Sequence, residues 1–202
     1  MAARVPGTTI AAPLPVHGAA VGTVTGQETL QEGHALFPQS DALVTTTPGI
    51  VLTITAADCL PVYFFDPVLG AIGLAHAGWR GLVAAPRGVL AATVDALTAL
   101  GSRPEDLHVE VGPSVGPCHY AVDADRRAQF SERFGAAVVC DQVLDLRRAA
   151  VRALLDAGLA AALVSAEPPC TACQPDRFFS RRIDGREPPE VGMAWIVMQR
   201  PG

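Results

Sequence analysis

A thiol, an imidazole, a carboxylate and a guanidinium occur at the ends of two apolar segments of this chain. The first segment ends in Ala-Asp58-Cys59-Leu-Pro and the second in His76-Ala-Gly-Trp-Arg80-Gly. Cysteine and histidine are zinc ligands and can also form a nucleophile and its base. Because only a short, turn-rich excursion separates the segments, we expect these side chains to meet at one end of a sheet. The spacing indicates an active site but leaves its chemistry open, since Cys59 or His76 alone is more often structural.

The elements that must position these side chains are short strands followed by a helical region. Residues 49–55 are rich in β-branched side chains and are expected to form a strand, as are residues 60–65 and 71–75. Glycine and proline in residues 66–70 predict the turn between the last two strands. Residues 80–100 have helical spacing, with a kink expected at Pro86 and an end at Gly101.

The second half of the chain continues to mix strands and helices. Asp123 is expected to cap a helix reaching about Phe134, and residues 144–159 form a second helical stretch. Further strands are expected at residues 107–111, 161–165, 178–182 and 193–198. This order lacks the regular alternation of a doubly wound parallel sheet. We therefore expect an α/β fold with a mixed sheet in a layered α/β/α arrangement.

Composition excludes several classes of protein. The 202 residues, half of them apolar, suffice for one substantial core, so a single domain over residues 1–202 is expected. A net charge of −5 argues against nucleic-acid binding. All 15 basic residues are arginine, which excludes a lysine Schiff base and a Walker lysine. No apolar run reaches the length of a membrane span, and the five cysteines do not form a disulfide pattern, so we expect a cytoplasmic protein with free thiols.

Five segments of the chain resemble the laccase-domain, or multicopper polyphenol oxidase, family. They lie at residues 16–18, 55–61, 76–81, 112–118 and 178–182. Members of that family are also described as purine nucleoside phosphorylases with adenosine deaminase activity, and some as peptidoglycan editing factors. The resemblance implies a nucleoside and phosphate as partners, and a fold similar to that of CNF-like cysteine hydrolases. Oligomeric state is left open.

The resemblance also implies a metal site. The histidine of Val-His-Gly, the cysteine of Ala-Asp-Cys-Leu-Pro and the histidine of His-Ala-Gly-Trp-Arg-Gly bind one zinc in the family, and here they are His17, Cys59 and His76. Three protein ligands leave a fourth tetrahedral position open, and zinc lowers the pKa of a bound water to ~7. Hydroxide can then attack C6 of adenine, whereas phosphorolysis requires phosphate on the sugar side. Cu²⁺ is an alternative occupant, since it outbinds Zn²⁺ at most N/S ligand sets.

Five further residues are candidates for catalysis or substrate binding. Asp58 is expected to transfer a proton or to orient a ligand imidazole. Arg80 is expected to bind phosphate or a substrate oxygen, with a structural salt bridge as the alternative. Asp41 matches an acidic position of the family and is expected to contact substrate, unless it caps a turn. Cys118, in the Gly-Pro loop, and Phe179, which could stack on a base, are further substrate-binding candidates, with packed core roles as the alternatives.

The remaining thiols and one histidine receive no functional role. Cys170-Thr-Ala-Cys173 has the spacing of half a zinc knuckle but lacks a second pair nearby in the sequence. His119 is interpreted as a solvent-facing neighbour of Cys118, and Cys140 as part of the core. Only sixteen residues precede His17, fewer than in the family, so we expect a shortened N-terminus and an incomplete substrate frame.

Three alternatives to a zinc-dependent purine nucleoside enzyme stay open. A copper-binding polyphenol oxidase of the laccase kind requires many more histidines than the five present. A metal-free cysteine hydrolase would use Cys59 as nucleophile and His76 as base, and needs an accessible thiolate of low pKa. A non-catalytic zinc-binding relic is the third. We favour the nucleoside enzyme, acting by deamination of adenosine, by phosphorolysis of adenosine, inosine or methylthioadenosine, or by both.

Overall fold

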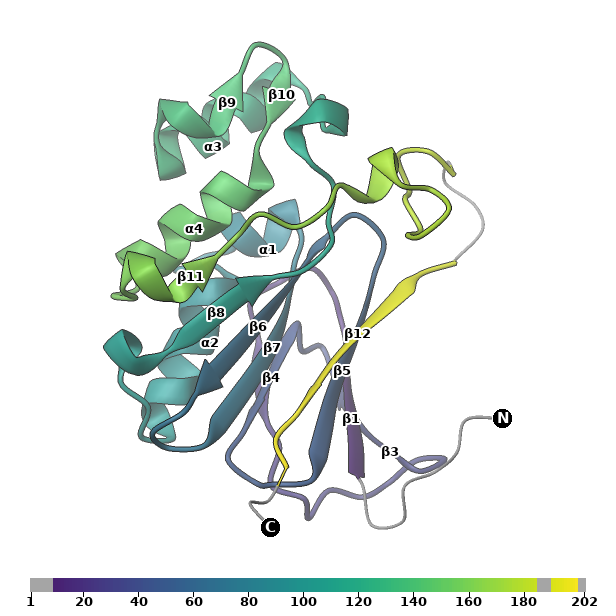
Figure 1. The fold of residues 1–202 in the computed structure, drawn as a ribbon, viewed down its shortest axis with the longest axis vertical. Coiled ribbons are helices and arrows are strands. Elements are labelled where there is room, and N and C mark those ends of the chain that lie inside the picture. Colours follow the sequence, from purple (N-terminus) through teal and green to yellow (C-terminus); the bar gives the residue numbers. More distant parts are fainter. Residues whose placement is uncertain (1–8, 185–189, 200–202) are drawn as a thin grey trace.

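A computed structural model of the protein describes residues 9–184 and 190–199, and shows two stacked sheets with helices on one side (Figure 1). The larger sheet contains β2 (Val21–Thr23), β4 (Ala42–Thr45), β6 (Leu60–Asp66), β7 (Ala71–Ala77), β8 (His108–Val111) and β11 (Val164–Ser165). Its strand order is β11-β8-β6-β7-β4-β2. The central strands are antiparallel, while β2 is parallel to β4 and β11 to β8. The expected mixed sheet is therefore confirmed.

The second sheet packs on the other face of the first. It contains β1 (Thr9–Leu14), β3 (His34–Pro38), β5 (Ile50–Ala56) and β12 (Gly192–Val197), in the order β12-β5-β1-β3. On the opposite face, α1 (Trp79–Val83) and α2 (Val89–Ala99) pack against the strands. On the same side, α4 (Leu146–Asp156) packs against α1 and α2, and α3 (Ala124–Phe134) packs against α4. The expected α/β/α order is therefore wrong, because one outer layer is a sheet. The short strands before residue 49 that build much of this layer were not predicted from the sequence.

Two apolar clusters lie on the two faces of the larger sheet. Phe64 of β6 and Ala75 of β7 belong to the cluster on the helical side, together with Leu97 of α2. Leu74 of β7 and Ile54 of β5 belong to the cluster between the sheets. All seven residues of β7 are buried because both of its faces are covered, which explains its unbroken apolar sequence.

Several predicted elements have the expected ends, and others differ. The helical stretch 80–100 is broken at Pro86 into α1 and α2, since proline has no N–H to donate. Asp123 caps α3 by accepting a hydrogen bond from Arg126 N–H at 2.8 Å, as predicted. The predicted strand 178–182 is wrong, because this segment is a loop whose bonds are local. Ser180 N–H donates to the Asp184 carboxylate at 3.0 Å, and Asp184 N–H donates to Ser180 O at 2.8 Å.

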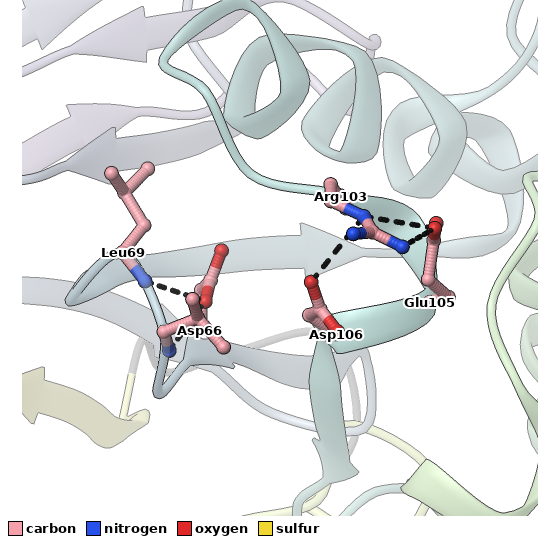
Figure 2. Close-up of polar contacts among 6 residues, drawn as sticks. Asp66, Leu69, Arg103, Glu105 and Asp106 are labelled. Carbon is pink, nitrogen blue, oxygen red and sulfur yellow. Dashed lines mark hydrogen bonds and ion pairs between the residues drawn. The ribbon is translucent and has the colours of Figure 1, made fainter.

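The register of the β6–β7 hairpin determines which residues meet at its open end. The carboxylate of Asp66 accepts hydrogen bonds from the N–H groups of Val68 at 2.8 Å and Leu69 at 2.9 Å, which shapes the turn (Figure 2). At the open end this register pairs Pro61 with His76. Because a slip of one residue would turn every side chain to the opposite face, the seven residue pairs of this hairpin hold His76 in its position. None of the helices in the described part of the chain is long and apolar enough to cross a bilayer.

Candidate metal centre

Three potential metal ligands from separate segments meet beside the open end of the β6–β7 hairpin. His17 lies in the loop between β1 and β2, Cys59 in the loop between β5 and β6, and His76 in β7. Each offers one ligand atom, and these atoms all lie within 4.8 Å of one another. The two imidazole rings have centroids 5.1 Å apart and an interplanar angle of 82°. The structure thus brings together the three residues for which the sequence resemblance implied a zinc site.

The ring of His76 is oriented so that one nitrogen is available to a metal. Its Nδ1 lies 3.0 Å from the carbonyl oxygen of Thr55, and a carbonyl only accepts, so Nδ1 carries the hydrogen. Its Nε2 is buried and has no hydrogen-bond partner among the described residues. Burial and the neighbouring His17 lower the pKa of His76, which keeps the ring neutral at pH 7. A neutral imidazole with a free Nε2 is the form that coordinates zinc.

The thiol of Cys59 lies against a glycine that leaves room for it. A Cβ atom at Gly78 would come within 2.9 Å of the Cys59 sulfur and 3.2 Å of His17 Cδ2. Any larger residue at this position of the His-Ala-Gly-Trp-Arg-Gly segment would therefore displace two of the three ligands. Burial raises the pKa of Cys59 to about 11, and the carboxylate of Asp58 adds to this effect. A free thiol in this environment is protonated at neutral pH, whereas a coordinating metal would hold it as thiolate.

Asp41 holds the backbone on both sides of His17. Its Oδ1 accepts a hydrogen bond from Val16 N–H at 3.0 Å, and its Oδ2 accepts one from Gly18 N–H at 2.9 Å. Its backbone oxygen also accepts from His76 N–H at 2.8 Å. Since the side chain is fully buried beneath the loop, its geometry differs from that expected of a substrate contact. A buried carboxylate requires such donors, and here they position a ligand whose own backbone is left-handed, with φ of 60°.

Asp58 connects the loop that carries Cys59 to the C-terminal part of the chain. Its Oδ1 accepts a hydrogen bond from the hydroxyl of Thr171 at 2.6 Å, and its Oδ2 accepts one from Arg182 N–H at 2.9 Å. Its backbone oxygen accepts from Val115 N–H at 3.0 Å. Neither carboxylate oxygen bonds to an imidazole in the described part of the chain, where Thr55 holds the ring of His76, and proton transfer by Asp58 stays a prediction. Asp58 is only 8% exposed, and its hydrogen bonds hold the loop of Cys59 in position.

Two arginines place positive charge near Cys59. The charges of Arg181 and Arg80 both act to lower the pKa of the Cys59 thiol, against the larger effect of burial. The guanidinium of Arg80 is exposed and lies 4.5 Å from the Trp79 ring centroid. Arg80 takes part in none of the ion pairs between described residues, so the salt bridge considered as its alternative role is absent there. Arg181 was not singled out from the sequence, although it directly follows Phe-Phe-Ser in the last segment of the family resemblance.

Phe179 lines a small pocket that borders the Cys59 loop. The side chain is 41% exposed, so the alternative of a buried core residue is wrong. The pocket has a volume of about 110 Å³. Its walls include Ala56 and Pro61 on the two sides of the Cys59 loop, Pro113, Thr171, and Phe178 next to Phe179. This volume is below the ~300–1,000 Å³ of pockets that enclose whole ligands. The pocket is therefore too small to enclose a whole ligand of that size.

Cys118 contacts other potential ligands rather than the His17, Cys59 and His76 group. It lies with His119, Cys170 and Cys173, and the ligand atoms of these four residues are also within 4.8 Å of one another. The sequence interpretation gave no role to the last three, because no second pair was recognised for Cys170 and Cys173 and His119 was interpreted as facing solvent. Cys140, expected in the core, is exposed.

Comparisons with known proteins support the family resemblance that the sequence motifs indicated. The family described as multi-copper polyphenol oxidoreductase laccase matches residues 2–199. A purine nucleoside phosphorylase of Xylella fastidiosa is 40% identical over 166 residues, which cover 79% of this chain and 62% of that protein. Purine nucleoside phosphorylase YlmD of Geobacillus stearothermophilus is 33% identical over 181 residues, covering 84% and 65%. This chain therefore spans less than two thirds of the length of these relatives.

Solved structures of similar proteins have the same fold. The crystal structure of YlmD from Geobacillus stearothermophilus superimposes with a TM-score of 0.80 at 32% identity, covering 92% of this chain and 72% of that one. The hypothetical protein YfiH of Bacillus licheniformis gives a TM-score of 0.83 at 27% identity, covering 94% and 74%. The match along nearly the whole sequence, together with these folds, shows that the chain belongs to the multi-copper polyphenol oxidoreductase laccase family.

Proposed function

We propose that this chain is a zinc-dependent purine nucleoside enzyme that phosphorolyses a purine nucleoside, deaminates adenosine, or does both. The observation that carries the proposal is the buried Nε2 of His76, beside Cys59 and His17, which has no hydrogen-bond partner within residues 9–184 and 190–199. A buried nitrogen without a hydrogen-bond partner is rare, and a metal ion would satisfy it. The relatives named purine nucleoside phosphorylase support the choice of substrate.

The donor set fits a catalytic zinc. One thiolate and two imidazoles are ligands that zinc prefers, and the exposure of His17 leaves one side of the group open to solvent. When bound, zinc would act as a Lewis acid and lower the pKa of a coordinated water to ~7. The chain's own residues keep the ligands in place, Thr55 through His76 Nδ1 and Asp41 through the backbone around His17. Cu²⁺ would bind the same ligands and is the alternative occupant.

We assign the substrate contacts to residues around the Cys59 loop. Arg80 and Arg181 would bind phosphate, since both are exposed and both place positive charge near Cys59. Phe179 would stack on the purine base in the small pocket that it lines. Asp58 and Asp41 would position ligands without touching substrate. The free thiols of all five cysteines suit a reducing compartment, so we place the protein in the cytoplasm.

Two alternatives are less well supported. A cysteine hydrolase, which the family's likeness to CNF-like folds would suggest, needs a thiolate of low pKa, whereas burial raises the pKa of Cys59 to about 11. A laccase requires several histidine-rich copper sites, and this chain has five histidines, of which His17 and His76 are in the proposed centre. A non-catalytic zinc-binding protein is the remaining alternative, and the following experiment distinguishes it from an enzyme.

The purified protein should be loaded with zinc and incubated with adenosine, with and without phosphate. Formation of adenine and ribose 1-phosphate only with phosphate would show phosphorolysis, and formation of inosine without it would show deamination. We expect His76→Ala and Cys59→Ser to lose both zinc at this centre and turnover. Cys140→Ser, at an exposed cysteine outside both ligand groups, is the matched control and should retain them. Absence of turnover in zinc-loaded, folded protein would refute the enzymatic proposal and favour the non-catalytic one.

A further inference from the structure

A second group of ligands lies outside the proposed active site, in the loop between β8 and α3 and the segment before Phe178. We propose that Cys118, His119, Cys170 and Cys173 form a structural zinc site, distinct from the His17, Cys59 and His76 centre. The two halves come from η2 (Pro117–His119) and from the start of η5 (Thr171–Cys173), for which Cys170 is the preceding residue. Three thiols and one imidazole are a common ligand set of structural zinc.

The distances within the group match the edges of a zinc tetrahedron. The sulfurs of Cys118 and Cys173 are 3.5 Å apart. Nδ1 of His119 lies 3.4 Å from the Cys118 sulfur, 3.5 Å from that of Cys173 and 3.8 Å from that of Cys170. With Zn–S of about 2.3 Å and Zn–N of about 2.0–2.1 Å, tetrahedral ligand atoms are separated by roughly 3.5–3.8 Å. Four of the six distances between donor atoms thus match a zinc tetrahedron, and all six are within 4.8 Å.

The surroundings of the group also suit bound thiolates. Gly116 N–H donates a hydrogen bond to the Cys170 sulfur at 3.2 Å, a contact that stabilises negative charge on sulfur. A Cβ atom at Gly116 would lie 3.3 Å from the Cys118 sulfur and 3.3 Å from Cys170 Cβ, so glycine permits this close approach. Four protein ligands leave no open position, which distinguishes a structural site from a catalytic one.

The proposed zinc would connect two loops that both support the active site. Thr171 N–H donates to Ser114 O at 3.1 Å, which joins the segment of Cys170 and Cys173 to the loop of Cys118. The hydroxyl of the same Thr171 donates to Asp58, the residue before Cys59. A metal that fixes Cys170 and Cys173 therefore also fixes the threonine between them. We infer that this second ion stabilises the loop that presents Cys59 to the catalytic metal.

Metal content of single variants tests the inference without reference to activity. After expression with zinc and purification under reducing conditions, we expect about two zinc ions per wild-type chain and about one in Cys118→Ser or Cys173→Ser. Cys59→Ser should also contain about one, having lost the other ion, and Cys140→Ser should retain about two. Wild-type zinc content in Cys118→Ser or Cys173→Ser would overturn the proposal. The proposal would also be overturned if the wild-type protein contained one zinc ion and Cys59→Ser contained none. That result would still support the His17, Cys59 and His76 centre.

A second measurement uses only the wild-type protein, in case a variant does not fold. Anaerobic titration of the metal-free chain with Co²⁺ should fill two tetrahedral sites, with thiolate-to-cobalt charge-transfer absorption from four cysteines. Absorption from a single thiolate would overturn the proposal. The five cysteines should all react with a thiol reagent once the protein is denatured with chelator. A disulfide within the group, seen as two thiols fewer together with one zinc ion, would likewise overturn it.

Discussion

Replacement of Asp41 by asparagine should weaken zinc binding through the backbone of the ligand loop. Asp41 accepts hydrogen bonds from Val16 N–H and Gly18 N–H with its two carboxylate oxygens, and His17 lies between those donors. Asparagine has the same shape but offers one oxygen and one NH₂ group, so one of the two N–H groups would face another donor. The charge of the acceptor is lost as well.

The expected loss of stability and of zinc affinity in Asp41→Asn follows from these two hydrogen bonds. A hydrogen bond to a charged group contributes about 1.5–3 kcal/mol, a neutral one about 0.5–1.5 kcal/mol, and a buried donor without a partner costs about 1–3 kcal/mol. Asp41→Asn should therefore lower the free energy of unfolding by about 2–4 kcal/mol. Because Asp41 holds the backbone on both sides of His17, zinc affinity at this centre should fall by about 10–100-fold, as for other residues that orient metal ligands.

The assay is competition for zinc against a chelator of known affinity, combined with urea unfolding. Asp66→Ala is the matched control, since Asp66 also binds two backbone N–H groups but lies at the far turn of the β6–β7 hairpin. It should lower stability and leave zinc affinity within about twofold of wild type. Unchanged zinc affinity in folded Asp41→Asn, or an equal loss in Asp66→Ala, would refute the positioning role of Asp41.

Three further predictions concern the ligand packing, the acid stability and the phosphate contacts. Gly78→Ala should weaken zinc binding at the His17, Cys59 and His76 centre by roughly tenfold, because the added Cβ would lie 2.9 Å from the Cys59 sulfur. A zinc affinity equal to that of the wild type would show that the ligands move aside freely. Burial acts to raise the pKa of Asp66, but hydrogen bonds from Leu69 and Val68 outweigh it and lower the pKa. Asp66 therefore adds stability above its unfolded pKa of about 3.9, and this stability is lost as pH falls through the lower folded value. Urea unfolding between pH 2 and 7 should show a flatter acid limb in Asp66→Ala, and an identical slope in both proteins would contradict this. Arg181→Ala should raise the KM for phosphate by about tenfold with no change in zinc content. The control is Arg103→Ala, which removes an exposed arginine paired with Glu105 near the start of β8 and should change neither quantity (Figure 2). A KM unchanged by Arg181→Ala would remove that residue from the phosphate site.

Local sequence patterns predicted the elements whose side chains interact with near neighbours. The strands β5, β6 and β7 were recognised from β-branched and apolar runs, and the break at Pro86 from the chemistry of proline. The cap at Asp123 was recognisable because it bonds to Arg126, three residues away. The short strands β1 to β4 were missed, since strands of three to six residues have little pattern of their own. The packing of β1 and β3 in the second sheet, and of β2 and β4 in the larger one, depends on partner strands elsewhere in the chain.

The sequence by itself determined the residue types at the metal centre, with His17, Cys59 and His76 in segments whose motifs are specific to one family. Tertiary structure alone decided what surrounds them. Asp58 bonds to Thr171, 113 residues further along the chain, and so connects two loops that are distant in the sequence. The group of Cys118 and Cys170 likewise exists only because two distant loops meet. Spacing along the chain predicts contacts between near neighbours, whereas contacts between distant segments form only when the chain packs. The second ligand group depends entirely on contacts between distant segments.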